Sequence, residues 1–195
     1  MAQKLLISEK PSLWKPKAIR EQHGYFGPKS SIVTDDEILR VFKDYKVTKC
    51  SNIYSESAKL LNNNQVIAWF QGRSESGPRA LGNRSILANP QFPELKHYLN
   101  KFIKFREDFR PYGCSVPEEY AHEYFEVPNL FPNPYMSFAT KVKPQFTSEL
   151  KEVSHIDGTS RMQTVSPIQN EAFYKLLNEF GSLSGLYCLL NTSLN

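Results

Sequence analysis

The spacing of apolar residues predicts four helices along the chain. Residues 34–45 open with the capping box Thr34-Asp-Asp-Glu and continue with apolar and aromatic positions at helical spacing, which predicts about three turns. Residues 53–61 are expected to form a second helix, which three consecutive asparagines end. A third helix is expected over residues 93–104, with one face formed by Leu95, Leu99, Phe102 and Ile103.

The fourth helix begins at Ser166, where the string SPIQ combines an N-cap serine, a proline at the first helical position and a capping-box glutamine. Gly181 is expected at the C′ position that ends this helix. Apolar runs and alternation predict strands over residues 65–70, 135–142, 162–165 and 186–190. Strands and helices in this order indicate the α+β class.

The beginning of the chain shows no sustained period. It is polar and contains Pro11, Pro16 and Pro28. We interpret residues 1–31 as an irregular arm or the remnant of a linker, and residues 32–195 as one folded domain.

Composition limits the class of protein. The 195 residues are 40% hydrophobic and 23% charged, which excludes disordered and fibrous chains. No apolar run approaches the roughly 18 residues of a membrane helix, and the N-terminus lacks the apolar core of a signal peptide. Three cysteines lie far apart and the four histidines lack ligand spacing. We therefore expect reduced thiols, a cytoplasmic protein and no metal site built from this chain's residues.

The net charge of +4 is concentrated in one part of the sequence. Residues 70–115 hold eight lysines and arginines against four acids, so the rest of the chain is balanced. A basic segment that also contains glycines suggests an anion site inside a folded domain. The alternative is a basic face that is simply solvated.

Residues 72–85 carry the strongest local signal for chemistry. Three glycines are spaced by five and let backbone approach a ligand closely, while three arginines offer planar donors that suit phosphate oxygens. The string lacks the ending of a P-loop and the glycine pattern of a Rossmann turn, so neither motif applies. These residues are Gly72, Gly77, Gly82, Arg73, Arg79 and Arg84.

Four blocks resemble one family in the same order. They are WFQGRSESGPRALGNRSILA at 69–88, KFREDFRP at 104–111, HIDGTSRMQTV at 155–165 and LNTSLN at 190–195. The chain thereby resembles the C-terminal domain of the nodulation- and tobramycin-type O-carbamoyltransferases. The resemblance implies a YrdC-like fold, with a mixed, twisted sheet flanked by helices. It also implies binding of carbamoyl phosphate and ATP, and formation of carbamoyl-adenylate.

The resemblance also implies site residues. The strings Lys104-Phe-Arg106 and Ser193-Leu-Asn195 fit patterns of the YrdC relatives. Adenylation brings anions together, so catalysis is mostly charge neutralisation and alignment. Mg²⁺ is expected with ATP, held by phosphates and water. The catalytic candidates are Arg79, Lys104 and Arg106, and the wider binding set adds Arg84, Arg110, Arg161, Ser193 and Asn195.

A larger N-terminal domain, actin-like and metal-binding, would pass the carbamoyl group to an acceptor hydroxyl in this family. We therefore expect an actin-like acceptor-binding domain or subunit as a partner, and only the adenylating half of the reaction in this chain.

Other interpretations stay open at this stage. Arg84 and Arg110 can instead be salt-bridge partners, and Trp69, Phe70, Phe102 and Phe109 are interpreted as core residues, one of which could stack on adenine. The domain can also be a non-catalytic nucleotide-binding or RNA-binding module. Turns interrupt the basic residues and leave no regular stripe, which disfavours nucleic acid.

Overall fold

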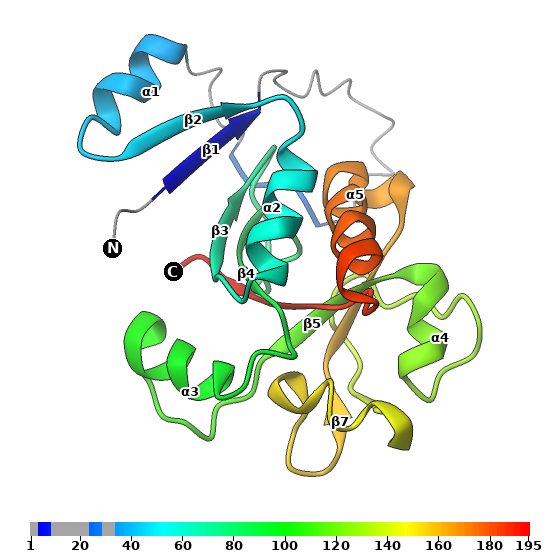
Figure 1. Ribbon diagram of the computed structural model, residues 1–195. Coiled ribbons are helices and arrows are strands. Elements are labelled where there is room, and N and C mark those ends of the chain that lie inside the picture. The colour runs from blue at the N-terminus through cyan, green and yellow to red at the C-terminus, as the bar shows by residue number, and fades with distance from the viewer. Residues whose placement is uncertain (1–3, 9–23, 29–33) are drawn as a thin grey trace.

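A five-stranded mixed sheet lies at the centre of the computed structural model, which describes residues 4–8, 24–28 and 34–195 (Figure 1). The strand order is β3-β4-β9-β5-β8; only the pair β5 and β8 is parallel. Helices flank this sheet, which confirms the expected α+β class with a mixed sheet. The strands are β3 (Ile67–Phe70), β4 (Arg84–Ala88), β9 (Leu189–Ser193), β5 (Gly113–Pro117) and β8 (Met162–Val165).

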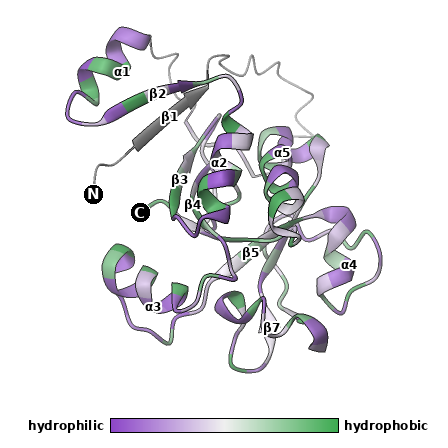
Figure 2. Cartoon of the chain, viewed as in Figure 1, coloured by the Kyte–Doolittle hydropathy of each residue, from purple (hydrophilic) through white to green (hydrophobic). Residues whose placement is uncertain are grey.

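Helices α2 (Ile53–Asn62) and α5 (Pro167–Ser184) pack together on one face of the sheet. Successive strand residues point to opposite faces, so Leu87 and Leu189 pack under these helices while Ile86 and Leu190 belong to the other cluster. Hydrophobic and hydrophilic residues alternate around both helices (Figure 2), as a helix with one buried face requires. None of the helices in the described ranges is long and apolar enough to cross a bilayer.

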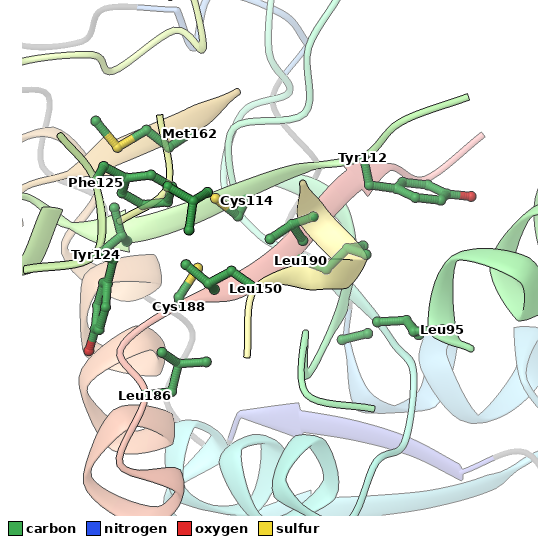
Figure 3. Packing of buried hydrophobic residues seen from close by; sticks show 14 of the residues in the cluster. Leu95, Tyr112, Cys114, Tyr124, Phe125, Leu150, Met162, Leu186, Cys188 and Leu190 are labelled. Atoms are coloured by element: carbon green, nitrogen blue, oxygen red, sulfur yellow. The ribbon is translucent and has the colours of Figure 1, made fainter. Parts of the chain in front are cut away.

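The opposite face carries the larger hydrophobic cluster (Figure 3). It is covered by α3 (Leu95–Leu99), α4 (Ala121–Tyr124) and three short turns. Leu95, Tyr124 and Leu150 belong to the same cluster as Cys114 and Cys188. Cys50, Cys114 and Cys188 are buried and form no disulfide. The turns are η3 (Glu118–Tyr120), η4 (Pro144–Phe146) and η5 (Lys151–Val153).

A small unit of α1, β1 and β2 lies beside the main sheet (Figure 1). The predicted capping box at Thr34 is present, but α1 (Asp35–Val41) is shorter than expected and none of its residues is buried. Strands β1 (Lys4–Ser8) and β2 (Lys46–Cys50) pair in parallel. Lys4–Ser8 thus form a strand within the expected irregular arm, most of which lies outside the described residues.

The third predicted helix is α-helical only in its first half. After α3, a π-helical turn, η2 (Asn100–Lys104), continues the chain. The wider turn breaks the α-helical spacing, and Phe102, expected in the core, is 56% exposed. Phe70 and Phe109 are also exposed, whereas Trp69 is buried as expected.

Two predicted strands were misplaced. Of residues 135–142, only β6 (Thr140–Lys141) is a strand, paired with β7 (Thr159–Ser160), because Met136 takes a positive φ of 55° that interrupts the extended chain. The last strand, β9, begins three residues later than the apolar run indicated. By contrast, α2, β8 and the start of α5 lie where the sequence predicts them.

Gly181 does not end α5, as the sequence suggested. The helix continues to Ser184, and Gly185 takes the left-handed conformation and donates its N–H to the Gly181 carbonyl at 2.9 Å. Gly181 is needed for a different reason: a Cβ there would lie 2.1 Å from the Tyr187 ring. The following strand therefore crosses α5 at van der Waals distance.

We expect Gly181→Ala to destabilise the protein by about 2 kcal/mol, because overpacking costs more than the roughly 1 kcal/mol that alanine gains in a helix. Urea unfolding measures the difference. Gly77→Ala is the control, since no atom lies within 4 Å of its added Cβ. An alanine at 181 that equals or exceeds the wild-type stability would contradict this packing argument.

Candidate functional site

A cleft of about 190 Å³ collects residues from the four sequence blocks. The loop before β4 contributes Arg79, the segment before β5 contributes Arg106, the residue before β8 is Arg161, and β9 contributes Ser193. These positions are far apart in the sequence and meet where the strands of the sheet end. The full lining is Pro78, Arg79, Ala80, Arg106, Pro111, Tyr112, Gly113, Met136, Arg161, Asn191, Thr192 and Ser193.

Three arginines line this cleft, and no carboxylate is among the lining residues that the structure describes. Arg106 donates from Nε to Asn100 Oδ1 at 2.8 Å and lies 4.5 Å from the centre of the Tyr112 ring. Its buried Nη2 and the buried Nε of Arg161 have no hydrogen-bond partner within the described ranges. Burial, and then the charge of Arg79, lowers the pKa of Arg161. Cations in this state favour an anionic partner.

Lys104 lies behind the cleft rather than in its lining. Its Nζ donates to the Ser193 carbonyl, to Ser193 Oγ at 3.1 Å and to the Asn195 carbonyl at 2.6 Å. Burial and the neighbouring Arg106 lower its pKa. Asn195 accepts from Ser193 Oγ but is exposed and outside the lining. Lys104 thus fixes the position of Ser193.

Arg84 and Arg110, also in the predicted binding set, lie outside the lining of the cleft as well. Arg84 donates to the carbonyls of Gln71 at 2.6 Å and Gly72 at 3.1 Å, and its guanidinium lies 3.5 Å from the centre of the Phe70 ring. Arg84 therefore closes the base of the glycine-rich loop instead of lining the cleft. Arg110 is exposed and is not a lining residue either.

Glu75 organises the loop that carries Arg79, a role that was not predicted from the sequence. One carboxylate oxygen accepts from the backbone N–H groups of Leu81 at 2.7 Å, Asn83 at 2.9 Å and Arg84 at 3.2 Å. Its sequence signal is that Glu75 is the one acid among the three arginines of residues 72–85. Backbone donors that no strand satisfies need such an acceptor.

Tyr25 supports the same loop from the beginning of the chain. Its buried Oη donates to the Leu81 carbonyl at 2.8 Å and accepts from Asn170 Nδ2 at 3.1 Å. Asn170 also donates to Asn83 Oδ1 at 2.9 Å. Burial raises the pKa of Tyr25 well above its ordinary value, so the hydroxyl keeps its proton at neutral pH. Tyr25 thus belongs to the structure of the site, although it lies in the expected arm.

Polar strand residues form the layer under the loop. Asn191 Nδ2 donates to the Ala80 carbonyl at 3.1 Å and to Ser115 Oγ at 2.9 Å. Gln163 Nε2 donates to the Leu81 carbonyl at 3.1 Å and its oxygen accepts from Ser115. These buried amides hold the consecutive carbonyls of Ala80 and Leu81 near the end of the loop. They explain why polar residues interrupt three otherwise apolar strands.

Comparison with known proteins identifies the family. Residues 58–195 match the family described as carbamoyltransferase C-terminus. The chain belongs to this carbamoyltransferase family, and it corresponds to the C-terminal part of the family's proteins.

Three relatives illustrate the match. The chain is 41% identical over 179 residues to nodulation protein NolNO of Sinorhizobium fredii, which covers 90% of the chain and 26% of the relative. It is 40% identical over 151 residues to nodulation protein U of Rhizobium tropici, covering 77% and 25%. It is 41% identical over 146 residues to 3'-hydroxymethylcephem-O-carbamoyltransferase of Amycolatopsis lactamdurans, covering 73% and 26%. The chain thus spans about a quarter of the length of these relatives.

We expect Glu75→Ala to weaken binding of inorganic tripolyphosphate about tenfold and to lower the free energy of unfolding by about 2 kcal/mol, because three backbone donors lose a charged acceptor. Calorimetry and urea unfolding measure the two effects.

The direction of the affinity change shows whether Glu75 acts by positioning the loop or by its charge near the anion site. Removing an acid beside an anion site should by charge alone strengthen binding, so tighter binding by Glu75→Ala would refute a positioning role. Glu75→Gln keeps an acceptor and should give an intermediate affinity.

Proposed function

We propose that this chain is the part of an O-carbamoyltransferase that binds carbamoyl phosphate and ATP and forms carbamoyl-adenylate. The observation that carries the proposal is the convergence of Arg79, Arg106 and Arg161 on a cleft without a lining carboxylate in the described residues. Both substrates are anions, and partly desolvated guanidinium groups bind phosphate and carboxylate oxygens strongly. The name of the cephem relative supports the transfer of a carbamoyl group to oxygen.

The reaction balances with water as a reactant. Water hydrolyses carbamoyl phosphate to carbamate and inorganic phosphate. A carboxylate oxygen of carbamate then attacks the α-phosphorus of ATP, and the bond to pyrophosphate breaks. Neither step requires a nucleophile from the protein, which is consistent with a site built from cations, amides and one hydroxyl.

Each residue has a distinct role in this proposal. Arg106 and Arg161, both partly buried, neutralise phosphate and carboxylate charge inside the cleft, and Arg79 does so at its exposed rim. Ser193 Oγ offers a hydrogen bond to a substrate oxygen, and Lys104 adds charge while it holds Ser193 in position. Mg²⁺ would be bound chiefly by the ATP phosphates and water.

Transfer to the acceptor is proposed to require a partner. The acceptor hydroxyl needs a base and a pocket of its own, and the resemblance assigns these to an actin-like domain or subunit. Because the relatives are about four times longer than the matched region, a second domain of that kind is compatible with their length. Three buried cysteines, none of them in a disulfide, support a reducing, cytoplasmic setting.

The test is carbamoyl-phosphate-dependent exchange of labelled pyrophosphate into ATP. Arg161→Ala and Arg79→Ala should each reduce exchange and ligand affinity roughly ten- to hundredfold, because a charge-assisted contact to phosphate contributes about 1.5–3 kcal/mol. Arg110→Ala is the matched control and should stay within about twofold, since its side chain is outside the cleft.

Two further outcomes decide between functions. Acetyl phosphate in place of carbamoyl phosphate should support no exchange, because it yields no carbamate. Anion binding without exchange, also when an actin-like domain is supplied, would contradict the adenylating role and favour a non-catalytic binding module.

A further inference from the structure

A second hollow adjoins the arginine cleft. It is shallow and open, measures about 380 Å³, and is lined by Asn100, Lys101, Phe105, Arg106 and Glu107. Arg106 lines both hollows, so the two are neighbours that share this arginine. Phe105 is the one aromatic lining residue of this second hollow.

The conformation of Phe105 is unfavourable for the isolated chain. The residue ends the π-helical turn with φ 47° and ψ 51°, a left-handed conformation that is rare for a bulky side chain. Its side chain is 83% exposed, so the ring gains little from burial. Phe102, by contrast, packs on the Tyr98 ring at 5.4 Å between centroids. Strained backbone with an exposed apolar ring is typical of a ligand site.

The volume of the arginine cleft indicates that a bound nucleotide would extend beyond it. The cleft's 190 Å³ lie below the roughly 300–1,000 Å³ of clefts that enclose drug-sized ligands. That space suits a phosphate and a carbamoyl group but not a whole nucleoside triphosphate. The base and ribose must therefore lie outside, and the hollow beside Arg106 is the adjoining space.

We propose that Phe105 is a stacking platform for the base of a nucleotide whose phosphates lie in the arginine cleft. The inference rests on the proposed function and assigns a residue for recognition of the base. Stacking requires only an exposed ring face, and Lys101 and Glu107 are the charged residues that line the same hollow beside Arg106.

The experiment compares two polyanions by calorimetry at equal free Mg²⁺, with the full chain. ATP carries a base and inorganic tripolyphosphate does not. Phe105→Ala should weaken ATP binding roughly 5- to 100-fold, the range expected for loss of one base–aromatic stack. Binding of tripolyphosphate should change less than about twofold. Phe105→Trp should bind ATP at least as tightly as the wild type.

Phe109→Ala is the matched control. Phe109 is 76% exposed, only four residues away, and lines neither hollow. Its replacement should leave both affinities unchanged. An equal effect of Phe105→Ala and Phe109→Ala on ATP would overturn the assignment to Phe105.

The remaining outcomes separate the two proposals. If wild-type protein binds tripolyphosphate as tightly as ATP, the platform is refuted and the anion site stands. If Phe105→Ala weakens both ligands equally, Phe105 positions Lys104 and Arg106 and does not stack on a base. An unchanged ATP affinity of Phe105→Ala would overturn the stacking role. If neither ligand binds, both the platform and the proposed function fail.

Discussion

The Glu75 carboxylate is the interaction on which the site depends. The chain between β3 and β4 must leave the sheet, present Arg79 and return, so its backbone N–H groups lose the partners a strand would provide. One carboxylate oxygen satisfies three of them. Gly82, with φ 99°, lets this turn lie directly against Phe173, where a Cβ would be 2.1 Å from the ring. The loop is therefore held by one acid and by contact with the core.

Clustered arginines make the cleft electrostatically costly without a ligand. Arg79 and Arg161 repel each other, and Arg106 contacts an amide oxygen and the Tyr112 ring. A carboxylate in the lining would relieve the repulsion but would also compete with an anionic substrate. The fold instead stabilises the cations with an amide oxygen, an aromatic ring and partial solvent access. Anion binding should then stabilise the folded protein, since it relieves repulsion only in the native state.

The sheet links this site to the hydrophobic core. Leu189 and Asn191 lie on the same face of β9, but the leucine is packed under α2 and α5 while the amide supports the loop over the cleft. Ser115 and Gln163 extend the polar group across β5 and β8. One end of this face is thus apolar and the other is a hydrogen-bonded layer. Buried amides that are hydrogen-bonded to the loop and to neighbouring strands restrict the backbone to one arrangement.

Local sequence determined the elements whose signals are local. The capping boxes at Thr34 and Ser166, the helix at 53–61 and the basic blocks follow from spacing and residue type, and the blocks also indicate the family. Tertiary structure decided what depends on distant partners. Strands β4 and β5 form around polar residues because β9 lies between them. Arg84 and Arg106 both lie in basic blocks of the sequence. The Arg84 guanidinium donates to backbone carbonyls, whereas Arg106 lines the cleft. The sequence does not show this difference, because the surroundings of each arginine come from segments far apart in the chain.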